Sequence, residues 1–225
     1  MAAMRMALNA AAAAVFTSIF TVSMAGQSSA DLPSDINAES LSRLPVVTRE
    51  SLADNDKRIY DYIAGPAGTA PKTGPGGVSL HSPPAAEAIQ MLNQALRRTV
   101  IGAKYFEISA LCAAREFDQQ YEWSGHEPAA VRAGVDQPTI DVIKYNRGVD
   151  GLEEKAATIV LMSRALFRGS HQMSAELWAK ATRLFGPRGA LEIPTIMGDY
   201  AMAAVMLNAV DQRLPAGRPP LLPAR

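Results

Sequence analysis

Apolar residues recur at three- and four-residue spacing through most of this chain, and this periodicity restricts its fold more than any other feature. Ile101, Tyr105, Ile108 and Cys112 form one such stripe, and no stretch shows the sustained two-residue alternation of a half-buried strand. The sequence therefore predicts an all-α protein of eight or nine helices packed as a bundle. The expected helices occupy 48–64, 82–96, 99–114, 121–133, 136–145, 153–166, 174–185 and 189–210.

Glycine and proline mark the expected interruptions between these helices. Gly65 to Gly77 is rich in both residues and is expected to be a long loop, either functional or a flexible crossing between helices. Asp150 to Glu153 has the spacing of a capping box, and Ser174 is placed to start a helix that stops at Gly186. Pro194 predicts a kink or a late start in the last helix.

The first thirty residues differ in composition from the rest. Arg5 precedes an uncharged, Ala-rich run from Ala7 to Met24, and Ser28-Ser29-Ala30 fits a small-x-small cleavage site. This pattern is typical of a secretory signal peptide, with cleavage after Ala30 or Ala25, and predicts a periplasmic or secreted protein. An uncleaved membrane anchor is the alternative. After cleavage we expect one domain over 31–217, a mobile Pro-rich tail over 218–225, and no stable membrane partner.

Charge and cysteine content exclude several classes of function. The 22 Lys and Arg residues balance the 22 Asp and Glu residues, so bulk charge gives no indication of a nucleic acid partner. Cys112, the single cysteine, cannot form an internal disulfide, and one cysteine rules out any CxxC redox or zinc motif.

The stretch from Glu107 to His126 carries the residues best suited to chemistry. Glu122 precedes His126 by four, so the two side chains share one face of a continuous helix, and Gln119 lies on that same face. A carboxylate beside an imidazole orients the ring and suits proton transfer near neutral pH. Glu107 lies beside a nearly uncharged run, so we expect it to be partly buried and to need a partner.

Simpler explanations exist for each of these residues. A solvent-exposed i,i+4 pair is the commoner origin of a Glu-x-x-x-His spacing. Two carboxylates and one histidine could also bind iron or zinc, but Glu107 is more simply explained as the partner of His126, so we expect no metal. His81 and His171 lie in expected loops, and Cys112 lies on an apolar face that favours an inert, buried thiol.

The motif Tyr121-Glu122-Trp123-x-x-His126, followed by Ala129-Ala130 and Ala133-Gly134, resembles the carboxymuconolactone decarboxylases and their wider relatives, the AhpD-like alkylhydroperoxidases. The stretches GPGGVSLHSPPAAEA and GALEIPTIMGDYAMAAVMLNAV also look like the longer members of that family, and the resemblance covers about 44–217. It implies an AhpD-like multi-helix bundle that assembles as homo-trimers or homo-hexamers, with the site near subunit contacts.

The decarboxylase branch implies a lyase that removes carbon dioxide from a small lactone carboxylic acid, without a cofactor. In that reading His126 handles a proton, while Glu122 and Glu107 orient it or serve as acid or base. Donors near the lactone carbonyl must stabilise the charge that develops there. The residues expected to bind the substrate are Tyr121, Trp123 and Tyr200.

Two alternatives remain open. The peroxidase branch carries a glutamate, a CxxC pair and a histidine; Glu107 and His126 match its spacing, but its cysteine positions fall on Gln119 and Glu122. Peroxide reduction is therefore disfavoured. The third hypothesis is a non-catalytic oligomeric binding protein that keeps the fold alone. Convergence of Glu107, Glu122 and His126 would favour an enzyme over this third reading.

Overall fold

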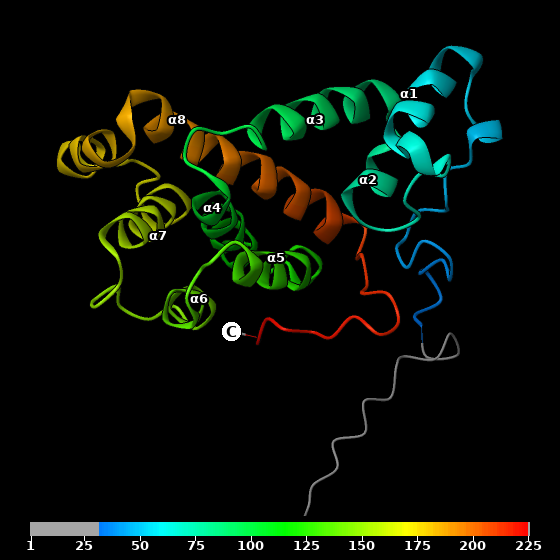
Figure 1. Ribbon diagram of the computed structural model, residues 1–225. Coiled ribbons are helices and arrows are strands. Elements are labelled where there is room, and N and C mark those ends of the chain that lie inside the picture. The colour runs from blue at the N-terminus through cyan, green and yellow to red at the C-terminus, as the bar shows by residue number, and fades with distance from the viewer. Residues whose placement is uncertain (1–31, 225) are drawn as a thin grey trace, which may run out of the picture.

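Eight α-helices make up most of the part of the chain that the structure, a computed structural model, describes, residues 32–224 (Figure 1). No strand occurs within these residues, where Asn37 and Ser42 form an isolated bridge. The all-α prediction is confirmed. The helices are α1 Asp54–Ala64, α2 Gly74–Ser79, α3 Pro83–Leu96, α4 Ala103–Glu116, α5 Gln120–Arg132, α6 Gln137–Lys144, α7 Glu154–Phe167 and α8 Ala175–Ala209.

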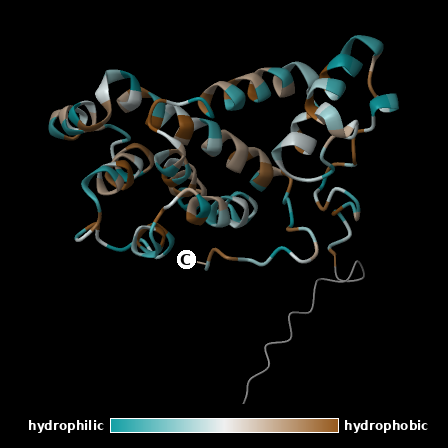
Figure 2. Cartoon of the chain, viewed as in Figure 1, coloured by the Kyte–Doolittle hydropathy of each residue, from teal (hydrophilic) through white to brown (hydrophobic). Residues whose placement is uncertain are grey.

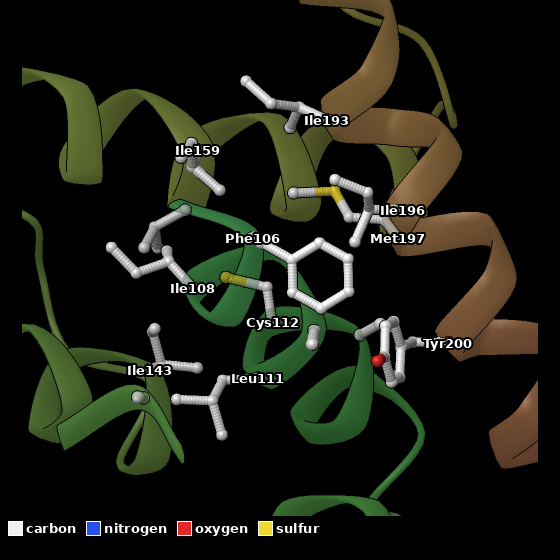
Figure 3. Close-up of a cluster of buried hydrophobic side chains, with 14 of the residues drawn as sticks. Phe106, Ile108, Leu111, Cys112, Ile143, Ile159, Ile193, Ile196, Met197 and Tyr200 are labelled. Carbon is white, nitrogen blue, oxygen red and sulfur yellow. The ribbon is translucent and has the colours of Figure 1, made fainter. Parts of the chain in front are cut away.

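Helix α4 is the centre of the fold. Every residue from Phe106 to Arg115 is buried, and the helix packs against α5, α6, α7 and α8. A helix surrounded in this way needs apolar or small side chains on all sides, and the run from Ile108 to Ala114 supplies them. Figure 3 shows the resulting cluster, with Tyr200 of α8 at its edge beside Phe106.

Helix α8 consists of two helical segments that meet at Gly186. This residue has φ 69° and ψ 168°, a conformation that favours glycine, and the predicted stop at Gly186 is correct. Pro194 lies inside the second segment, as expected. Among the described helices, α8 is long and apolar enough to span a membrane, but half of its apolar window is buried, which is typical of a core helix.

Helices α1 and α2 lie together at one end of α3, away from α6 and α7 (Figure 1). They enclose a smaller apolar cluster that includes Tyr60 and Leu80. Helix α1 is mostly hydrophilic, whereas hydrophobic residues recur along α8 (Figure 2). The N-terminal domain edge therefore depends on few apolar contacts.

Three local predictions differ from the structure. Residues Gly74–Ser79 form helix α2 inside the expected loop, because Pro75 suits a first helical turn. Thr48 caps a short 3-10 turn, Arg49–Ser51, rather than α1 itself. The expected capping box at Asp150 is absent, since Glu153 takes the cap position of α7 without a side-chain hydrogen bond.

The two ends of the chain have different standing. The predicted signal peptide, residues 1–30, lies outside the described residues. The described part of the predicted mobile tail contacts α4 and α5: Leu222 is buried, its backbone pairs with the side chain of Gln120, and Arg115 Nη1 donates to the Pro223 carbonyl. The sequence gave no sign of these contacts, because proline-rich ends show no helical or strand periodicity.

Candidate active site

A tight turn after α4 sends the chain into α5 and brings the expected residues together. Asp118 adopts φ 49° in this turn, and Gln119 follows as the N-cap of α5. The Gln119 side chain accepts a hydrogen bond from the backbone N–H of Tyr121 at 2.7 Å and donates to Asn208 Oδ1 at 2.6 Å. Gln119 thus fixes where α5 starts and joins it to α8, and its polar atoms serve the fold.

Glu107 and His126 form the centre of the site. His126 Nδ1 lies 2.7 Å from Glu107 Oε2, and the two side chains are 13% and 8% exposed. The expectation that Glu107 is buried and partnered is confirmed. With Glu107 ionised, Nδ1–H donates to the carboxylate, which leaves Nε2 of a neutral imidazole free to accept a proton.

Glu122 faces the second nitrogen of the same ring. Its Oε2 lies 3.6 Å from His126 Nε2, which is beyond hydrogen-bond distance. Within residues 32–224 no donor reaches the buried Oε1 of Glu122. Burial raises the pKa of the Glu122 carboxyl, and Asp199 adds to the rise, while His126 opposes it. The carboxyl is therefore suited to hold a proton beside Nε2.

Tyr200 covers the imidazole from α8. Its ring meets His126 edge to face, with 4.6 Å between centroids, and burial raises the pKa of the phenol above its ordinary value. Arg97 Nη2 donates to the phenol oxygen at 3.1 Å. The Tyr200 hydroxyl stays protonated across the physiological range and keeps its own hydrogen to donate.

Three polar residues at this site had no signal in the sequence. Arg97 and Asn93 come from the end of α3, and Asp199 comes from α8. Asn93 Nδ2 donates to Asp199 Oδ2 at 2.9 Å, and burial raises the pKa of the Asp199 carboxyl although this hydrogen bond opposes the rise. Helix packing joins these segments across about a hundred residues, so no local motif could have found them.

Tyr121 and Trp123 lie outside this group of side chains. The Tyr121 hydroxyl lies 2.9 Å from Thr73 Oγ1, and its ring packs so closely on Gly74 that a Cβ there would come within 2.5 Å. Trp123 is fully buried, and its indole N–H donates to Glu127. Full burial leaves Trp123 no surface for a substrate. Of the three expected substrate-binding residues, Tyr200 alone contacts His126 in the structure.

Metal and thiol chemistry have no assembled site in the described chain. No group of three His, Cys, Asp or Glu side chains there is arranged to hold a metal ion. Burial raises the pKa of the Cys112 thiol to about 12, so the reactive thiolate does not form near neutral pH. His81 and His171 are exposed and lie near backbone carbonyls, at 2.9 Å from Pro45 and 3.0 Å from Leu166.

A cavity of about 1110 Å³ lies between the C-terminal segment and the start of α5. Gln119, Asn208 and Arg218 are among its lining residues, whereas Glu107, Glu122 and His126 are not. We place the candidate site at His126 despite the size of this cavity, because chemistry needs converging titratable groups and the cavity wall does not provide them.

Comparison with known proteins gives a match in structure alone. A scan against protein-family models and a search of curated proteins find no match. The debrominase Bmp8 in complex with 2,3,4-tribromopyrrole is similar with a TM-score of 0.57 and 16% identity, over 76% of this chain and 90% of that one. Bmp8 in its apo form gives 0.57 and 16%, over 76% and 91%.

A third similar structure is the alkylhydroperoxidase AhpD core of an uncharacterized peroxidase-related protein from Ralstonia eutropha JMP134. Its TM-score is 0.58 at 18% identity, over 77% of this chain and 92% of that one. Identities this low carry the architecture and not the chemistry. The chain has an AhpD-like all-α fold.

Proposed function

We propose that this protein is an enzyme related to the carboxymuconolactone decarboxylases, which transfers a proton during decarboxylation of a small carboxylated lactone or a related acid. The observation that carries the proposal is the position of His126 between two buried carboxyl groups, at 2.7 Å from Glu107 and 3.6 Å from Glu122. A buried, oriented imidazole with an acid beside its second nitrogen is a common arrangement for general acid–base catalysis.

Each residue takes a defined part in the proposed reaction. The bond between the ring carbon and the departing carboxylate breaks, carbon dioxide leaves, and the electron pair enters the lactone as an enolate. The Tyr200 hydroxyl donates to the developing enolate oxygen. His126 Nε2 delivers a proton to carbon, Glu122 supplies that proton, and Glu107 holds the ring and stabilises its charged form.

The alternatives have less support. A peroxide-reducing enzyme of this fold needs an accessible thiolate, and Cys112 is buried. A non-catalytic binding protein needs no histidine held between two buried acids, and an unpaired buried carboxyl costs the fold stability. An enzyme gives this cost a purpose.

The test is carbon dioxide release, together with lactone absorbance, on γ-carboxymuconolactone. We expect turnover by the purified protein and its loss in His126→Ala, with His81→Ala as the control at an exposed histidine. Turnover that survives His126→Ala would refute the assignment of the site. No turnover by the unaltered protein would reject this substrate.

Assembly and export form part of the proposal. Exposed apolar side chains on α3 and α8 support a homo-oligomer, a trimer or hexamer: Met91, Leu191 and Val205 are 60%, 62% and 54% exposed. Light scattering should then give three or six times the chain mass, and a monomer would contradict it. The composition of residues 1–30 supports export, which sequencing of the N-terminus of the protein from the periplasm would test.

A further inference from the structure

Arg97 lies at the edge of the candidate site, half in contact with it and half in solvent. Its guanidinium stacks over the Phe106 ring at 5.0 Å, and its Nη2 donates to the Tyr200 hydroxyl at 3.1 Å. Its Nε donates to Asn93 Oδ1 at 3.3 Å. The side chain is nevertheless 51% exposed. Three neighbours hold the guanidinium in place while one side of it faces water.

No carboxylate within residues 32–224 forms a hydrogen bond with Arg97. The nearest, Glu107 Oε1, lies 4.0 Å from Nη1, and the other oxygen of Glu107 is occupied by His126. By contrast, Arg168 forms two hydrogen bonds to Glu116, at 2.7 and 2.6 Å. A guanidinium has five N–H donors in a fork that fits a carboxylate, and neutral groups take two of them in Arg97.

The charge around the site makes a cation at this position necessary for an anionic substrate. Glu107, Glu122 and Asp199 are all buried there, at 6%, 5% and 6% exposure. Any of these that is ionised repels a carboxylate. Arg97 contributes positive charge to the same site, since it lowers the pKa of both Glu122 and Asp199 against the effect of burial.

We propose that Arg97 binds a carboxylate of the substrate, one that the reaction leaves in place, through the exposed N–H groups of its guanidinium. Binding of the departing carboxylate would stabilise the ground state and slow its loss, so Arg97 is assigned to a retained one. The site then selects small lactone acids with a second carboxylate over neutral lactones. This inference rests on the proposed function for the identity of the substrate.

The experiment measures binding without turnover, by calorimetry. The probe is 5-oxotetrahydrofuran-2-acetate, a saturated lactone with one carboxymethyl group and no carboxylate to lose, and its methyl ester is the neutral match. Arg97→Gln should weaken binding of the acid about ten- to a hundredfold and change binding of the ester less than about twofold. Arg97→Lys should restore part of the loss, since it keeps the charge without the fork.

Arg98→Gln is the matched control, because it removes the same charge from the next, exposed residue and should leave both affinities unchanged. Equal losses for acid and ester in Arg97→Gln, or no loss for the acid, would overturn the inference, as would failure of the unaltered protein to bind the acid. Carbon dioxide release tests the reaction separately. Acid binding through Arg97 without turnover would leave the anion site standing and reject the reaction.

Discussion

The two ends of α5 each hold a glutamate in a nearly buried setting, and the two settings are opposite. At one end Glu127 accepts hydrogen bonds from Lys144 Nζ, at 2.9 Å, and from the Trp123 indole. At the other end, Glu122 Oε2 lies 3.6 Å from His126 Nε2 and its Oε1 has no donor within the described residues. A paired buried charge joins elements, whereas an unpaired carboxyl costs stability.

This contrast separates structure from function within one helix of thirteen residues. The Glu127–Lys144 pair connects α5 to α6, and both of its oxygens are in use. Glu122 and His126 keep hydrogen-bonding capacity that the fold does not use, which is what a reacting group needs. The predictions below test whether the two ends differ in this way.

The largest expected effect is on catalysis. Glu107→Gln replaces the carboxylate that orients His126 with an amide that cannot stabilise the charged ring, so turnover should fall about 10²–10⁴-fold. Glu127→Gln makes the same chemical change at the other end of the contrast and should leave turnover per folded molecule within about twofold. Steady-state rates on the same substrate measure both. Equal losses in the two variants would remove the distinction.

The next effect is on stability. Lys144→Met leaves Glu127 buried without its cation, so we expect a loss of about 3 kcal/mol in the free energy of unfolding, measured in urea. The double variant with Glu127→Gln should recover part of that loss, since the neutral amide no longer needs a cation. A change below about 0.5 kcal/mol for Lys144→Met would show that the pair does not hold the fold.

A smaller, pH-dependent effect is expected at Glu122. Burial raises the pKa of its carboxyl above the ordinary 4.5, so folding loses free energy as the pH rises from that value through the raised one. Glu122→Gln removes this loss. The variant should therefore melt a few degrees higher than the unaltered protein at about pH 8, with the gain disappearing near pH 4. A gain equal at both pH values would show that ionisation is not its cause.

The smallest effect is expected at Cys112, a buried titratable group on α4 that belongs to neither end of α5. Burial raises its pKa to about 12, so the thiol is neutral and unreactive. Cys112→Ser should change lactone turnover less than about twofold, and neither form should reduce peroxide with a thiol reductant. Peroxide turnover that disappears in Cys112→Ser would revive the peroxidase reading.

The fold was predictable where the determinants are local. Helical spacing gave the helices, and Asp136, Ser174 and Gly186 marked boundaries of α6 and α8 through side-chain caps and a backbone that favours glycine. Helix α2 was missed because Gly74-Pro75-Gly76-Gly77 has poor intrinsic helix propensity, and tertiary contacts decide its conformation.

The site was predictable to the same extent. Glu122 and His126 meet through i,i+4 spacing, and Glu107 reaches His126 through the short turn between α4 and α5. Arg97 and Asp199 join through packing of α3 and α8, which no spacing along the chain encodes. Trp123 next to Glu122 suggested an apolar wall, but adjacent helical residues point about 100° apart, so its indole lies in the core with Glu127.

The most direct test of the central claim is a ¹⁵N NMR spectrum of the histidine side chains at neutral pH, with His126→Gln to assign the signal among the three histidines. We predict that His126 carries its proton on Nδ1, in a hydrogen bond that Glu107→Gln weakens, and that Nε2 is unprotonated or exchanges its proton. A neutral ring with its proton fixed on Nε2, and no response to Glu107→Gln, would contradict the proposed proton transfer.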